Sequence, residues 1–148
     1  MSSSPKDKPN VLFIITDQHR ADHVGFGGNS VVSTVHLDAL ASRSTIFDRA
    51  YVANPVCMPN RSSIMTGRMP SAHGVIFNDR SLSPDANTFV GQLRKVGYQT
   101  ALIGKSHLQH GMSRESIADL PGDSARDSLW AKGWDTVEHQ ERYENGDT

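Results

Sequence analysis

Cysteine is scarce in this 148-residue sequence, which contains a single thiol and therefore cannot form an internal disulfide. Long apolar runs are also missing, since no stretch reaches the length that a membrane-spanning helix needs. Residues 1–10 are polar and lack the apolar core of a secretory signal. We therefore expect a cytoplasmic protein with no membrane partner; a mature secreted chain with an added start methionine would show the same features.

An excess of charge of one sign is absent as well. The chain has 15 Lys and Arg residues against 16 Asp and Glu residues, and its formal net charge is -1. No block of lysine or arginine is present, so the sequence has no electrostatic footprint for nucleic acid. Charged residues make up 21% and hydrophobic residues 36%, a composition that permits a folded domain with a core.

The chain does contain an alternation of strand-like and helix-like patterns. The apolar, β-rich run of residues 11–16 predicts a strand buried on both faces, as in a parallel sheet. The predicted elements are strand 11–16, a helix from Thr34, strand 46–52, helix 59–67, helix 87–96 and strand 99–103. This order predicts an α/β fold with a largely parallel central sheet flanked by helices. Residues 1–9 are predicted to be a flexible leader to one domain of residues 10–148.

Three polar clusters lie where predicted strands end or helices begin. Asp17-Gln18 follows the first strand, residues 57–61 enter a helix, and residues 105–107 follow the last strand. The carboxyl ends of parallel strands meet at one edge of a sheet, where ligands bind in α/β folds. We therefore expect the clusters to form one site that binds a metal and an anion.

The central cluster resembles the signature of the sulfatase family, Cys-x-Pro-x-Arg followed by a helix that ends in Thr-Gly. Here Cys-Met-Pro-Asn-Arg occupies residues 57–61, and Thr-Gly occupies residues 66–67. Residues 97–107, from Gly-Tyr-Gln-Thr to Gly-Lys-Ser-His, resemble the second sulfatase signature. The resemblance covers residues 8–108 and implies an alkaline-phosphatase-like fold, of which this chain is the N-terminal portion.

The resemblance also implies which residue is the nucleophile. In the family a separate formylglycine-generating enzyme oxidises the motif cysteine, here Cys57, to formylglycine. The hydrated aldehyde attacks the ester with one hydroxyl and later expels the bound group with the other. The position of Cys57 at the start of a helix agrees with this role, because N-terminal amides favour an anion. The alternative for a lone cysteine is a buried structural residue.

The metal ligands that the resemblance implies are Asp17, Gln18 and the modified Cys57. A hard divalent cation, calcium or alternatively manganese or magnesium, prefers carboxylate oxygens such as those of Asp17. Gln18 stands where many sulfatases have a second acidic residue, a change that resembles the phosphonate monoester hydrolase branch. Arg61 lies one helical turn after Cys57, and in the family this arginine holds the deprotonated diol beside the metal.

Substrate contacts are implied at three further positions. Lys105 and His107 match the sulfatase pair that contacts the ester group and the leaving oxygen; lysine supplies charge, and histidine can give a proton. Asn78 resembles a substrate-contacting asparagine of the phosphonate hydrolase branch, and a simple turn residue is the alternative.

The sequence thus predicts metal-dependent hydrolysis of a small-molecule sulfate ester by a formylglycine derived from Cys57. A phosphonate or phosphate ester hydrolase of the same superfamily is the alternative, which Gln18 and Asn78 favour, whereas Lys105 and His107 favour a sulfatase. A hypothesis from another class is a truncated, non-catalytic module that needs a partner chain.

Nothing after Leu108 resembles the downstream metal ligands of the family. We therefore expect the chain to work with a missing C-terminal portion or as a homo-oligomer.

Overall fold

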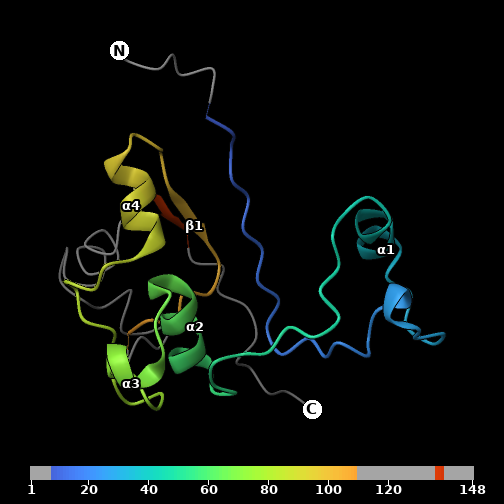
Figure 1. Cartoon of the computed structure of the whole chain (residues 1–148), viewed down its shortest axis with the longest axis horizontal. Coiled ribbons are helices and arrows are strands. Elements are labelled where there is room, and N and C mark those ends of the chain that lie inside the picture. Colours follow the sequence, from blue (N-terminus) through green and yellow to red (C-terminus); the bar gives the residue numbers. More distant parts are fainter. Residues whose placement is uncertain (1–7, 110–135, 139–148) are drawn as a thin grey trace. The chain divides into compact units, whose positions relative to one another are not determined.

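The computed structural model describes residues 8–109 and the backbone of residues 136–138 (Figure 1). It contains two compact units, Met1–Ala50 and Tyr51–Thr148. The predicted leader, residues 1–9, lies mostly outside the described residues, and its last two residues are exposed.

The first unit is built around a short helix and the loop that packs on it. Helix α1 spans Val35–Ala41, as predicted, and the 3-10 helix η2 spans Gly25–Gly27. Thr34 is the N-cap of α1, but its hydroxyl bridges the two elements instead of capping. It accepts a hydrogen bond from the Gly25 N–H (2.7 Å) and donates one to the Asp38 carboxylate (3.0 Å). A Cβ at Gly25 would collide with this carboxylate, so a larger residue there would have to displace the Asp38 side chain.

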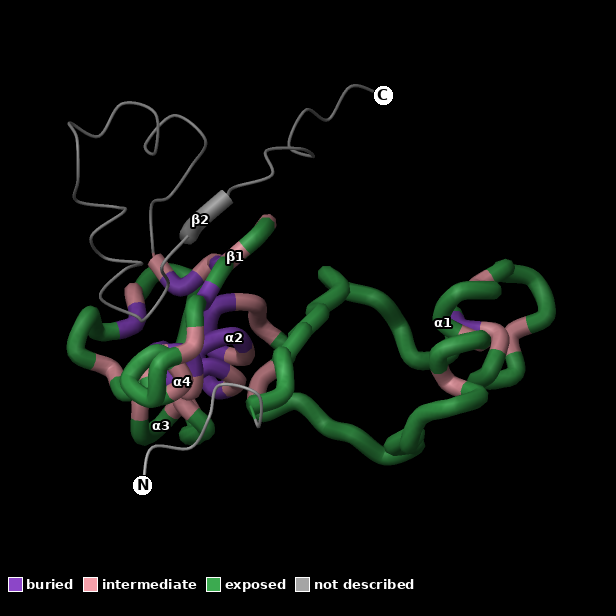
Figure 2. Tube along the Cα trace, turned by 90° about the horizontal axis from the view of Figure 1, so that it is seen from above, coloured by how far each residue is buried: buried purple, intermediate pink, exposed green. Residues whose placement is uncertain are grey.

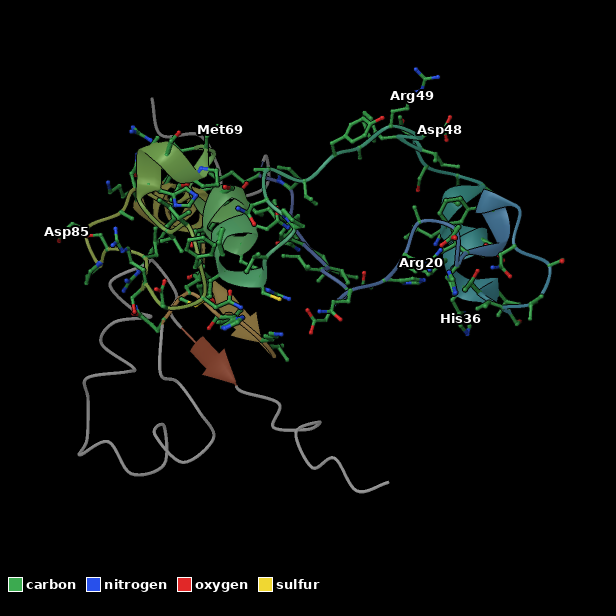
Figure 3. All side chains as sticks on the ribbon, turned by 90° about the horizontal axis from the view of Figure 1, so that it is seen from below. Arg20, His36, Asp48, Arg49, Met69 and Asp85 are labelled. Atoms are coloured by element: carbon green, nitrogen blue, oxygen red, sulfur yellow. The ribbon has the colours of Figure 1, made fainter. Side chains whose placement is uncertain are left out.

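The predicted strands at residues 11–16 and 46–52 are wrong, since neither segment joins a ladder. The apolar side chains of residues 11–15 keep between 37% and 85% of their surface exposed. Figure 3 shows Asp48 and Arg49 projecting away from the ribbon of the second segment. A strand buried on both faces needs neighbouring strands to pair with and helices to cover it. A β-favouring composition does not supply these partners, and residues 8–109 do not provide them here.

The second unit begins with the longest described helix, α2, which spans Cys57–Thr66. It ends where the sequence predicts, at Gly67, whose φ of 66° lies in the left-handed region that glycine adopts readily. Helix α3 follows at Pro70–His73. Within the part of the chain that the structure describes, no helix is long and apolar enough to cross a bilayer.

The second unit continues with helix α4 and strand β1. Helix α4 spans Phe89–Lys95, inside the predicted helix, and the hydroxyl of its N-cap Thr88 accepts from the Gly91 N–H at 3.0 Å. Strand β1, Ala101–Ile103, lies inside the predicted strand and pairs in parallel with β2, Thr136–Glu138. The direction is the predicted one, but two strands are not the predicted central sheet.

The core of the second unit lies against α2 (Figure 2). Met58 and Met65 are two helical turns apart and therefore share one face of α2. They pack with buried residues from the segments that follow, which are Val75, Leu82, Val90 and Leu108. Burial of this face holds the helix that begins at Cys57 against the segment that follows β1.

His73 links α3 to α2 through its ring. The Nδ1 atom accepts a hydrogen bond from the Val75 N–H at 3.2 Å, and Nε2 lies 2.9 Å from the Ser63 hydroxyl. Because Nδ1 accepts, the neutral ring carries its proton on Nε2 and donates it to Ser63. Burial lowers the pKa of His73 below its ordinary value, since an imidazolium loses solvation there. His73 therefore stabilises the unit in its neutral form.

We expect acid to weaken the fold through His73. Because the pKa is lower in the folded chain, the contribution of His73 to the free energy of unfolding is complete above the unfolded pKa, near 6.5, and is lost as the pH falls through the folded pKa. The drop in melting temperature between about pH 7.5 and about pH 5 should be smaller in His73→Gln than in the native chain. His36→Gln, at an exposed position of the first unit (Figure 3), should keep the native dependence. Equal pH dependence in His73→Gln and the native chain would contradict this role.

Candidate active site

Cys57 is the first residue of α2 and is half-buried. The preceding Val56 is extended, with φ -89° and ψ 143°, and its N–H donates to the side-chain carbonyl of Asn54 at 2.8 Å. This turn directs the chain into the helix. Pro59 fits the first helical turn because the N–H that it lacks would have no intrahelical partner there. The local sequence thus places the thiol in the first turn of a helix.

Most amides of the first turn of α2 are already occupied. The Met58 N–H donates to the side-chain carbonyl of Asn78 at 3.0 Å, and the Asn60 N–H donates to the Val56 carbonyl at 3.1 Å. The Cys57 N–H has no acceptor among the described residues. The attraction of this helix start for an anion therefore rests on the amide of Cys57 and on nearby positive side chains.

Arg61 lies one turn after Cys57 and is only 8% exposed. Its Nη1 donates a hydrogen bond to the backbone carbonyl of Lys105 at 2.8 Å. The bond crosses from α2 to the segment that follows β1. Two of the three predicted polar clusters, residues 57–61 and 105–107, therefore meet within the second unit.

The segment after β1 is held in a bent conformation. His107 has a φ of 46°, in the left-handed region that non-glycine residues seldom adopt. Ser106 and Leu108 on either side are buried, and the Leu108 carbonyl accepts from the Leu82 N–H at 2.9 Å. Lys105 is exposed and His107 is half-buried. The buried neighbours sustain the strained backbone at His107, a feature that is common at functional positions.

Asp17 and Gln18 belong to the first unit, where both are exposed and Gln18 has a φ of 53°. Their carboxylate and amide oxygens are donors of the kind that a hard divalent cation binds, but calcium takes roughly six to eight oxygens. No group of three or more His, Cys, Asp or Glu side chains able to hold an ion occurs within residues 8–109. The described residues alone do not complete a metal site.

An exposed ionic cluster follows Gln18 in the first unit, and Figure 3 labels its arginine. Arg20 Nη2 lies 2.5 Å from one carboxylate oxygen of Asp22, and His23 Nδ1 lies 2.8 Å from the other. The hydrogen bond from Arg20 holds the pKa of Asp22 well below its usual range. This carboxylate is therefore engaged within its own loop.

Asn54 accepts a hydrogen bond next to Cys57, and its turn could have been predicted from the sequence. An asparagine whose side chain bonds the N–H two residues on is a common turn pattern, and the proline that follows it strengthens the signal. Asn54-Pro55, directly before the motif, carries that signal.

A sequence model of the family described as Sulfatase matches residues 9–140. Similar proteins include an ulvan-active sulfatase of Formosa agariphila, 41% identical over 101 residues, and an arylsulfatase of Clostridium perfringens, 38% identical over 102 residues. Each match covers 68% of this chain, and 20% and 21% of those proteins respectively.

Solved structures give the same picture. The putative sulfatase yidJ from Bacteroides fragilis is similar with a TM-score of 0.68 and 33% identity, over 77% of this chain and 26% of that one. The phosphonate monoester hydrolase of Agrobacterium radiobacter is similar with a TM-score of 0.72 and 26% identity, over 93% of this chain and 27% of that one. The chain thus spans about a fifth to a quarter of the length of these relatives.

We expect Arg61 to be needed to join α2 to the segment after β1. Arg61→Ala removes a charged donor from the Lys105 carbonyl and should lower the free energy of unfolding by about 1.5–3 kcal/mol. Arg61→Lys keeps the charge but not the planar guanidinium, and should lose roughly half as much. Urea denaturation measures both.

The matched control is Arg68→Ala, at an exposed position just after α2, which should change stability by less than about 0.5 kcal/mol. If Arg61→Ala were as stable as this control, the Arg61 bond would not hold the two segments together.

Proposed function

Because the chain belongs to the sulfatase family, within the alkaline-phosphatase-like superfamily, we propose that it carries the nucleophile of an enzyme that hydrolyses sulfate esters. The observation that supports this most is the hydrogen bond from Arg61 to Lys105, which joins the helix that begins at Cys57 to the segment with His107. A nucleophile, a fixed positive charge, an ammonium group and an imidazole are what cleavage of an anionic ester requires.

Cys57 is proposed to act after oxidation to formylglycine by a separate formylglycine-generating enzyme. The hydrated aldehyde supplies two hydroxyl groups on one carbon, one to attack sulfur and one to release the bound sulfate. The half-burial of Cys57 suits this role, because the helix start fixes the residue while part of its surface stays accessible.

The other residues of the second unit are proposed to handle charge and protons. Arg61, anchored to the Lys105 carbonyl, keeps a fixed positive charge one helical turn from the nucleophile and favours a deprotonated hydroxyl there. The exposed Lys105 ammonium attracts the ester oxygens. The half-buried His107 imidazole gives a proton to the leaving oxygen.

A divalent cation, calcium or alternatively manganese or magnesium, is part of the proposal. Asp17, Gln18 and the modified Cys57 would hold it, together with ligands that the described residues do not supply. When bound, the cation supplies Lewis-acid stabilisation of the anionic ester.

The chain is shorter than its relatives, and the proposed activity therefore needs further protein. Since the chain spans about a fifth to a quarter of its relatives, we assign the activity to an assembly with a C-terminal portion or to a homo-oligomer. In that assembly a largely parallel central sheet flanked by helices would cover the exposed apolar side chains of residues 11–15. If the chain showed no activity after its partner was supplied, it would be a non-catalytic module and this proposal would be contradicted.

A phosphonate or phosphate ester hydrolase is the second candidate. Gln18, in place of a second carboxylate, favours it, as does the similarity to a phosphonate monoester hydrolase over 93% of the chain. The ratio of kcat/KM for an aryl sulfate to that for an aryl phosphonate decides between the two, and a ratio above one supports the sulfatase.

Replacement of Cys57 should abolish turnover without unfolding the protein. In the complete enzyme, co-expressed with a formylglycine-generating enzyme, Cys57→Ala should reduce aryl sulfate hydrolysis by at least about a thousandfold. Cys57→Ser should also be poor, because one hydroxyl cannot expel the ester from a diol. Peptide mass spectrometry of the native protein should find formylglycine at residue 57. Turnover near the native level in Cys57→Ala would rule out this nucleophile.

Removal of divalent metal should lower activity, and its return should restore it. Exhaustive dialysis against EDTA should abolish hydrolysis by the complete enzyme, and calcium, manganese or magnesium should recover it. Asp17→Asn should raise the metal concentration needed for half-recovery more than Gln18→Ala does, because a carboxylate is the stronger ligand. The reverse order would contradict the assignment of Asp17 as a metal ligand.

A further inference from the structure

Helix α2 begins without a cap of its own. Its N-cap residue is Val56, which has no side-chain hydrogen bond, and its first turn contains no acidic residue. Valine is among the least favourable residues at this position, where Ser, Thr, Asp or Asn normally accepts from a free amide. The helix that presents Cys57 therefore depends on acceptors from elsewhere.

Two asparagine side chains supply those acceptors on either side of Cys57. The Asn54 carbonyl accepts from the N–H of Val56, one residue before Cys57, at 2.8 Å. The Asn78 carbonyl accepts from the N–H of Met58, one residue after it, at 3.0 Å. Asn54 is local to the turn, whereas Asn78 comes from 20 residues further along the chain. The backbone on both sides of the nucleophile is thereby fixed.

The chemistry of these acceptors matters as much as their geometry. A carboxylate would accept the same bonds and would gain from the positive end of the helix dipole, so stability alone favours aspartate at least as much. A carboxylate would also place a negative charge next to the residue that attacks an anionic ester, and like charges at short range repel. An asparagine carbonyl caps the helix and leaves the site free of that charge.

We propose that Asn78 is a positioning residue that caps the Cys57 helix through its carbonyl, and that Asn78 and Asn54 together hold the nucleophile with neutral acceptors. The reason for neutrality rests on the proposed function, whereas the capping does not. Since the carbonyl of Asn78 serves the helix, any contact of this residue with a substrate oxygen comes from its amide NH2, the end that can donate.

Hydrogen–deuterium exchange of the 148-residue chain tests the capping without any assay of activity. In a peptide that spans Asn54 to Arg61, Pro59 has no amide, so the Met58 N–H is one of few exchanging groups. Asn78→Ala should speed exchange at Met58 roughly tenfold, whereas Asn78→Asp, which keeps an acceptor of the same shape, should retain native protection.

Two matched variants complete the exchange experiment. Asn54→Ala should speed exchange at Val56 and leave Met58 protected. Asn87→Ala, which removes an exposed asparagine outside α2, should change neither amide. Native protection of Met58 in Asn78→Ala would overturn the proposal. Equal loss of protection in Asn78→Ala and Asn78→Asp would also overturn it, because Asn78→Asp keeps the acceptor and should therefore keep the cap.

Steady-state kinetics of the complete enzyme test the reason for neutrality. Asn78→Ala should lower kcat roughly ten- to a hundredfold, since a loosened helix start misplaces the nucleophile. Asn78→Asp should keep kcat within about threefold of native and raise KM for an aryl sulfate roughly tenfold, since the cap persists and the new charge repels the ester. A loss of kcat in Asn78→Asp as large as in Asn78→Ala, with Met58 still protected, would show direct contact with the reacting group and overturn the positioning role. A native enzyme that hydrolyses no ester would refute the proposed function and leave the exchange result standing.

Discussion

Arg61 carries its guanidinium into a nearly buried position, where a charged group is costly unless its donors find partners. The Lys105 carbonyl is one such partner, and it lies 44 residues further along the chain. This hydrogen bond joins two stretches that are far apart in the sequence, helix α2 and the segment that follows β1. The positions of Lys105 and His107 relative to Cys57 depend on this link and on the buried core face of α2 that supports it.

The charges of the second unit follow from the same arrangement. The nearly buried Arg61 lies one turn after Cys57, and the first turn of α2 has no acidic residue. The side-chain carbonyls of Asn54 and Asn78 accept from the amides on either side of Cys57. The amides that flank Cys57 are therefore bound by neutral acceptors, and the first turn of the helix places no negative charge beside the proposed nucleophile. An anionic ester, the proposed substrate, would meet no repulsion from this turn.

Local signals in the sequence were enough for α1, α2 and α4, whereas the short helices α3 and η2 were not predicted. Pro59 marks the first turn of α2 and Gly67 its end, because each signal acts within a few residues. The prediction of strands at residues 11–16 and 46–52 failed, since a ladder requires a partner that composition does not specify. The bond between Asn78 and Met58 is equally invisible, because it is made by tertiary folding and not by a short motif. Asn54 was accessible to sequence reasoning, since its turn is local.

The segment between Met58 and Asn78 determines where the side chain of Asn78 meets helix α2. That segment holds α3, and the hydrogen bond from the His73 ring to Ser63 fastens α3 back onto α2 before the chain reaches Asn78. The segment from Ser63 to Asn78 therefore has a fixed length, which places the side-chain carbonyl of Asn78 next to the Met58 N–H. An inserted or deleted residue between Gly74 and Asn78 would move that carbonyl while leaving the Cys-x-Pro-x-Arg pattern unchanged. In this protein the site is therefore encoded by a motif and by the number of residues that separate it from a remote asparagine.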